Sequence, residues 1–112
     1  RWDPANAAQA RYWSWQYPST ALLPMMARVA LVRGSPLESI TTPTLVLYSP
    51  QDQVVDPSKT EQAFARFGAR DKRLQAVNDS ADRSSHVLAG DILAARDTAR
   101  VREWIVDFLE PR

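Results

Sequence analysis

A short, almost unbroken apolar run at residues 43–49 constrains the fold more than any other part of the chain. It reads Pro-Thr-Leu-Val-Leu-Tyr-Ser, and Asp52 follows three residues after its end. Because its apolar residues do not alternate with polar ones, the run is typical of a parallel strand that is covered on both faces. Ligand-binding residues of open parallel sheets lie just past the carboxyl ends of such strands, which is where Asp52 falls.

A second strand is predicted at residues 73–78, where polar and apolar residues partly alternate, as in a strand at or near the edge of a sheet. Between the strands, Asp56 before Pro57 predicts the start of a helix, and Gly68 predicts its end. A helix that joins two neighbouring strands gives a right-handed parallel unit. The sequence therefore predicts an α/β fold.

The flanking segments predict three more helices. Asp3-Pro4 is expected to cap the first, and Pro24 is expected in the first turn of the second, which Gly34 ends. The final helix is predicted at residues 98–109, because apolar residues recur there with helical spacing. They are Val101, Trp104, Ile105, Phe108 and Leu109. Aromatic residues near the start of the chain fit either a packing face or an acyl-pocket wall; these are Trp2, Tyr12, Trp13, Trp15 and Tyr17.

Composition excludes several classes of protein. With 112 residues there is room for one small domain, and a hydrophobic content of 45% is that of an ordinary globular chain. The 14 basic and 13 acidic residues are mixed along the sequence, so no nucleic-acid partner is expected. There is no cysteine for a disulfide or a thiolate metal site, no metal or organic cofactor is implied, and the compartment stays open. Because the chain begins at Arg1, we expect it to be processed or part of something longer.

The only histidine, His86, lies in a polar loop at residues 78–90, after the second predicted strand. A neutral imidazole can take a proton from a hydroxyl nucleophile, provided that a carboxylate orients its other nitrogen. Asp52 fits that role, whereas Asp56 is expected to cap a helix and Asp82 is either a local orienting group or a turn residue. The alternative is that His86 is a surface residue and Asp52 only a turn former.

Two segments resemble the carboxyl-terminal part of α/β-hydrolases, in the branch of esterases, monoacylglycerol lipases and lysophospholipases. Residues 43–55 resemble the acid-bearing segment of that family, with Asp-x-Val-Val at 52–55, and residues 84–91 resemble its histidine loop. The order of acid, histidine and one last helix also matches. The resemblance implies that Asp52 is the triad acid and His86 the general base. It also implies that Val54 and Val55 pack beneath the loop, and that Val54, Val87 and Leu88 border the substrate.

The family's nucleophile is a serine in Gly-x-Ser-x-Gly. The chain has three glycines, at positions 34, 68 and 90, and no two of them flank a serine in this way. We therefore expect a C-terminal fragment of a serine hydrolase that acts on carboxylic esters through an acyl-enzyme and is inactive alone. Residues 1–39 would be the lid exit and the helices before the acid-bearing strand, and residues 40–112 the end of the hydrolase core.

A different class stays open. The chain could be a non-catalytic, stand-alone α/β module that associates with copies of itself. The predicted strand at residues 43–49 has one edge without a partner, and an unpaired apolar strand promotes association. We expect either a homo-oligomer or pairing with a missing N-terminal part. A hydrogen bond between Asp52 and His86 would favour the catalytic interpretation, and a wide separation would favour the scaffold.

Overall fold

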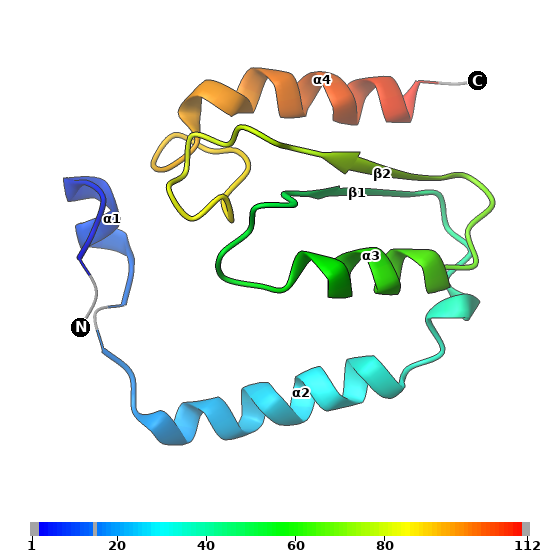
Figure 1. The fold of residues 1–112 in the computed structure, drawn as a ribbon, viewed down its shortest axis with the longest axis horizontal. Coiled ribbons are helices and arrows are strands. Elements are labelled where there is room, and N and C mark those ends of the chain that lie inside the picture. The colour runs from blue at the N-terminus through cyan, green and yellow to red at the C-terminus, as the bar shows by residue number, and fades with distance from the viewer. Residues whose placement is uncertain (1–2, 15, 111–112) are drawn as a thin grey trace. The chain divides into compact units, whose positions relative to one another are not determined.

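The computed structural model describes residues 3–14 and 16–110, so the predictions for Trp2 and Trp15 lie outside the described residues. The chain forms two compact units, one up to Pro36 and one from Leu37 (Figure 1). The first holds helices α1 (Ala7–Tyr12) and α2 (Leu22–Gly34). The second holds β1 (Thr44–Tyr48), α3 (Pro57–Arg66), β2 (Lys72–Ala76) and α4 (Thr98–Leu109). Short 3-10 turns lie at Ser19–Ala21, Leu37–Ser39 and Ala95–Asp97.

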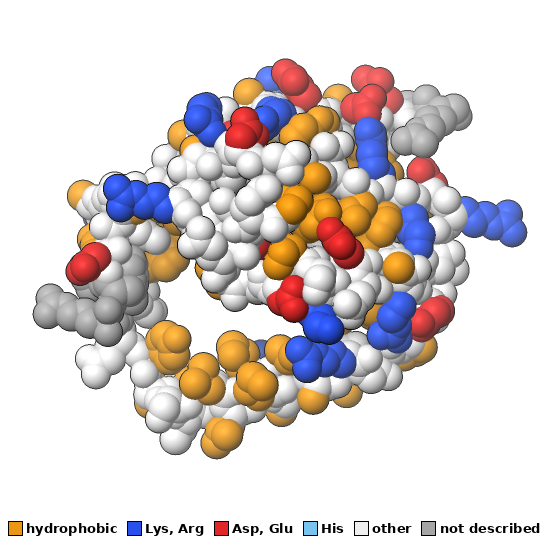
Figure 2. Space-filling view, viewed as in Figure 1, with side chains coloured by type: hydrophobic (Ala, Val, Ile, Leu, Met, Phe, Trp, Pro, Cys, Tyr) orange, Lys and Arg blue, Asp and Glu red, His pale blue; other side chains and the backbone are white. Residues whose placement is uncertain are grey.

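In the first unit, the predicted cap of the first helix is wrong. Asn6, not Asp3, precedes α1, and its side chain accepts a hydrogen bond from the Gln9 N–H at 2.9 Å. An asparagine in this position satisfies one of the donors that the first helical turn leaves unpaired. Pro24 lies in the first turn of α2 as predicted, where its missing N–H removes no helical bond. Figure 2 shows that apolar side chains of α2 lie at the surface.

In the second unit, β1 and β2 form a parallel pair in the register Thr44↔Lys72 to Tyr48↔Ala76. The α/β fold with parallel strands is therefore as predicted, although each strand is shorter than its predicted range. After Ala76 one further bond follows, from the Val77 N–H to the Tyr48 carbonyl at 2.8 Å. Beyond it the polar residues from Asn78 onward leave the sheet.

Helices α3 and α4 cover opposite faces of this sheet. The Lys72 ammonium donates to carbonyls at the end of α3, including that of Phe67 at 2.7 Å. The neighbouring Arg73 pairs with Asp107 of α4. Successive strand residues point to opposite faces, so the two helices lie on different sides of the strands, as Figure 1 shows. The outer part of the predicted α4 stripe is not covered, since Ile105 and Leu109 are exposed whereas Val101 is buried.

The ends of α3 follow the sequence signals. Asp56 caps the helix by accepting from the Ser58 N–H at 2.9 Å, and Pro57 begins it. Beyond the helix, a Cβ at Gly68 would lie 2.0 Å from the Glu38 carbonyl oxygen, so only glycine fits there. Arg66 pairs with the Glu38 carboxylate at 2.8 Å and holds the same two segments together.

Among the described residues, no helix has the length and apolar character needed to cross a membrane.

Candidate active site

The chain turns sharply after β1, in a segment that we call the acid turn (residues 49–55). The Asp52 N–H donates to the Ser49 carbonyl at 3.2 Å, which closes a four-residue turn with Pro50 in its second position. Proline favours that position because its fixed φ suits it. The Asp52 Oδ1 atom then accepts from the N–H groups of Val54, at 2.8 Å, and Val55, at 3.0 Å. Neighbouring backbone thus holds one carboxylate oxygen, and Oδ2 points to another partner.

That partner is His86, which lies in the segment that we call the histidine loop (residues 78–90). Its Nδ1 atom lies 2.8 Å from Asp52 Oδ2, although 34 residues separate the two in sequence. The Asp52 side chain is 9% exposed and the imidazole 41% exposed. A second bond joins the two segments, from the Gln53 N–H to the Ser84 carbonyl at 2.9 Å.

The other ring nitrogen of His86, Nε2, has no hydrogen-bond partner within residues 3–14 and 16–110. When Nδ1 carries the proton and donates it to the carboxylate, Nε2 has a lone pair that can accept one. This arrangement can hold an imidazole in one tautomer and present a base toward solvent.

Several groups act on the ionisation of Asp52. Burial disfavours the charged form, but the Val55 N–H, the His86 imidazole and the Val54 N–H together outweigh it, so the pKa of Asp52 is lower than that of an ordinary aspartate. Hydrogen bonds and a nearby partner favour the charged carboxylate. The residue is therefore an anion when it faces His86 at neutral pH.

The histidine loop contains a buried carboxylate, Asp82. From the sequence, Asp82 was either a group that orients His86 or a turn residue. Its side chain makes no hydrogen bond to the imidazole. Instead its Oδ2 atom accepts from the backbone N–H groups of His86, at 3.1 Å, and Val87, at 3.0 Å, and from the Ser84 hydroxyl at 2.5 Å. Asp82 is thus a loop-forming residue; its position four residues before His86 was the only signal in the sequence.

Sequence reasoning missed Asp97, which ties the histidine loop to the start of α4. Its carboxylate is 2% exposed and accepts from the Ala81 N–H at 2.7 Å and from Arg100 at 3.0 Å. Arg100 also pairs with Asp79 at 2.8 Å. An aspartate just before a predicted helix reads as a cap, so the sequence offered no sign of this long-range contact.

The remaining predicted site residues differ in their exposure and in their contacts. The expectation that Val54 and Val55 pack beneath the loop is wrong, because they are 61% and 47% exposed. Their N–H groups bind the Asp52 carboxylate, and their side chains are left near solvent. Val87 and Leu88 are half-buried. Asp56 caps α3, as its place before Pro57 predicted.

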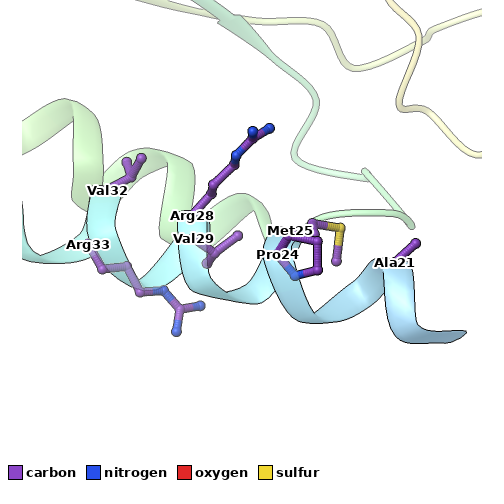
Figure 3. A pocket seen from close by; sticks show the side chains of 7 residues that line it. All are labelled: Ala21, Pro24, Met25, Arg28, Val29, Val32 and Arg33. Carbon is purple, nitrogen blue, oxygen red and sulfur yellow. The ribbon is translucent and has the colours of Figure 1, made fainter.

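A hollow of about 550 Å³ lies along α2, and none of the sequence-predicted site residues lines it. All the residues that line it belong to α2 or to the turn before it (Figure 3). They are Ala21, Pro24, Met25, Arg28, Val29, Val32 and Arg33. None of them bears a nucleophile or a general base. Over the part of the chain that the structure describes, no cluster of three or more His, Asp or Glu side chains could hold a metal ion.

A parallel β-α-β unit, with a carboxylate past its first strand and a histidine past its second, is the arrangement of the α/β-hydrolase class. A family model described as serine aminopeptidase, S33, matches residues 10–81, and the chain belongs to that hydrolase family. The matched range includes Asp52 and ends before His86. Searches of curated proteins and of solved structures gave no match. The resemblance to α/β-hydrolases is therefore confirmed.

Proposed function

We propose that this chain is the C-terminal portion of a serine hydrolase, in which Asp52 is the triad acid and His86 the general base. The observation that carries the proposal is the 2.8 Å contact between His86 Nδ1 and Asp52 Oδ2. The aspartate fixes the tautomer and stabilises the imidazolium, and the exposed side of the ring accepts the proton. The membership of a hydrolase family supports the same reaction class.

The reaction would run in two steps, with an oxygen nucleophile from outside this chain. The hydroxyl oxygen attacks the substrate carbonyl while its proton passes to His86 Nε2. The imidazolium then protonates the leaving group, and an acyl-enzyme forms. In the second step a water gives its proton to Nε2, attacks the acyl carbon and releases the acid. The nucleophile regains its proton from the imidazolium.

The nucleophile and the oxyanion hole would come from a part of the protein that precedes this chain and continues its sheet. In a parallel pair, alternate residues of a strand bond to the partner. The Thr44 N–H donates to the Asp71 carbonyl and the Tyr48 carbonyl accepts from the Val77 N–H, at the two ends of β2. The N–H and C=O groups of Leu45 and Leu47 therefore point to the other edge of β1. A further parallel strand on that edge would end next to Asp52. We propose that edge as the docking site of the rest of the hydrolase core.

The substrate is the finer part of the proposal. We propose carboxylic esters, following the resemblance of residues 43–55 and 84–91 to esterases and lysophospholipases. The description of the matched family names an aminopeptidase, so aminoacyl amides are the competing class. Aryl esters and aminoacyl p-nitroanilides with the same acyl group would separate the two. Faster hydrolysis of the anilides would contradict the ester proposal without affecting the roles of Asp52 and His86.

The roles of the pair are tested in the full protein that contains this chain, including whatever precedes Arg1. We expect His86→Gln and Asp52→Asn each to lower kcat by about 10³–10⁴-fold, because the base is lost or its tautomer changes. Asp56→Asn is the matched control: Asp56 also bonds to backbone, but it caps α3 and does not reach His86. Its activity should stay within about threefold. Unchanged activity in His86→Gln would refute the proposal.

A non-catalytic module that self-associates through the same edge is the competing function. Light scattering of the purified 112-residue chain measures its oligomeric state, and an activity measurement is also needed to distinguish this module from the hydrolase. The module would be favoured by three results together: the chain forms a defined oligomer, no fluorophosphonate labels it, and its natural form has no further segment. Labelling of a serine that precedes this chain in the full protein would favour the hydrolase.

A further inference from the structure

We propose that Asp82 is a positioning residue of the same site. Its buried carboxylate folds the histidine loop so that the imidazole of His86 reaches Asp52. This inference rests on the proposed catalytic role of His86, since Asp82 acts on the reaction only through that side chain.

The geometry concentrates three hydrogen bonds on one atom. Asp82 Oδ2 accepts from Ser84 Oγ at 2.5 Å, from the His86 N–H at 3.1 Å and from the Val87 N–H at 3.0 Å. The N–H groups that flank the His86 side chain are thus held at one point. Because the Cα–Cβ bond of His86 starts between them, their orientation fixes the direction in which the imidazole leaves the backbone.

Further bonds close the loop around Asp82. Its carbonyl accepts from the Ser85 N–H at 2.9 Å, and its N–H donates to Ser80 Oγ at 3.2 Å. The Ser80 hydroxyl in turn donates to the Val87 carbonyl at 2.8 Å. Ser85, directly before His86, has a φ of 54°, a left-handed conformation that costs a serine free energy. The bonds to Asp82 compensate for that cost.

Charge is part of the effect. Asp82 is 8% exposed, and its three donors carry no formal charge of their own. Burial raises its pKa, but the bonds from Ser84, Val87 and His86 lower it further than burial raises it, so the pKa lies below the ordinary value. An ionised acceptor makes stronger hydrogen bonds than a neutral amide oxygen. Asparagine should therefore preserve part of the loop geometry, and alanine none of it.

The test compares Asp82→Asn, Asp82→Ala and Ser84→Ala in the full protein, with Asp56→Asn as control. In Asp82→Ala we expect kcat to fall about 10²-fold with KM within twofold, because a displacement of about 1 Å at a catalytic group has an effect of that size. Asp82→Asn should lose about 10-fold. Ser84→Ala keeps both backbone donors and should lose about threefold or less.

A nuclear magnetic resonance readout separates positioning from stability. The Nδ1 proton of His86, identified by its loss in His86→Gln, should resonate far downfield in the wild type because it is bonded to Asp52. We expect that signal to weaken or shift in Asp82→Ala and to be partly restored in Asp82→Asn. If Asp82→Ala lowers only the melting temperature and leaves the signal and kcat unchanged, Asp82 is not a positioning residue.

The outcomes also separate this inference from the proposed function. If His86→Gln abolishes activity but Asp82→Ala has the activity and Nδ1 signal of the wild type, the triad assignment stands and the inference fails. If His86→Gln is fully active while Asp82→Ala still displaces the Nδ1 signal, the loop geometry is as proposed but the catalytic role of His86 fails, and the inference as stated is overturned with it.

Discussion

The acid turn and the histidine loop bring the two halves of one contact together by different means. In the acid turn, Asp52 bonds to residues two and three positions further along the chain. In the histidine loop, the backbone around His86 bonds to Asp82, four residues earlier. The loop as a whole is held by Asp97, sixteen residues beyond Ala81. Asp52 is oriented locally, and His86 through contacts more distant in sequence.

The difference predicts which segment is more sensitive to substitution. A turn built from Ser-Pro-x-Asp has strong local preferences of its own, so it forms wherever the preceding strand ends. A loop that contains a left-handed serine has no such preference and requires buried carboxylates to hold it. Substitutions that remove those carboxylates should therefore lower the free energy of unfolding more than equivalent changes in the acid turn.

The largest effect on stability is expected for Asp97→Ala. It leaves the Ala81 N–H without its acceptor and removes a buried partner of Arg100, which should lower the free energy of unfolding by about 3 kcal/mol. Urea denaturation of the protein would measure this. The control is Asp79→Ala, which removes the exposed partner of Arg100 and should cost about 0.5 kcal/mol. Equal losses in the two variants would show that burial of Asp97 is not what anchors the loop.

A smaller effect is expected from acid, and it involves both segments. The pKa values of Asp52 and Asp82 are lower in the folded chain than in an ordinary aspartate. Their stabilisation is therefore complete above the unfolded pKa of about 3.9, and is lost as the pH falls below it through the folded-state pKa. Urea midpoints measured from pH 6 down to pH 3 should fall in the wild type and fall less in Asp82→Asn. An identical pH dependence in the two proteins would contradict the lowered pKa of Asp82.

The sequence predicted the elements with strong local signals. The apolar run at 43–49, the Asp56-Pro57 cap and the close of α3 before Gly68 each depend on neighbouring residues, and the structure has them nearly where expected. The cap at Asp3 was wrong because Asn6, three residues later, offers an equally good acceptor. The exposure of Val54 and Val55 was also missed. Their backbone N–H groups orient the Asp52 carboxylate, and this does not determine where their side chains point.

What sequence could not predict about the candidate site is how its parts are tied together. The pairing of Asp52 with His86 could be predicted from their residue types and their positions after two strands. The bond from Gln53 to Ser84 and the contact of Asp97 with Ala81 depend on how the loops approach, and no local pattern encodes that. Long-range contacts of a loop follow from the packing of the whole unit.

The smallest predicted effect separates the two segments most directly. Ser85→Gly removes the side chain from a residue whose φ is 54°, so the relief of backbone strain should exceed the cost of the added entropy of the unfolded chain. We expect the free energy of unfolding to rise by about 0.5 kcal/mol. Gln53→Gly is the matched change in the acid turn; Gln53 is exposed and, within the described residues, has no positive φ.

Gln53→Gly keeps the backbone N–H that donates to Ser84, so only the cost of added chain freedom remains, and stability should fall by about 0.5–1 kcal/mol. The two urea midpoints should therefore move in opposite directions. If both variants are destabilised to the same extent, Ser85 stores no strain. The histidine loop would then have its own local preference, like the acid turn, and Asp82 would have less to hold in place.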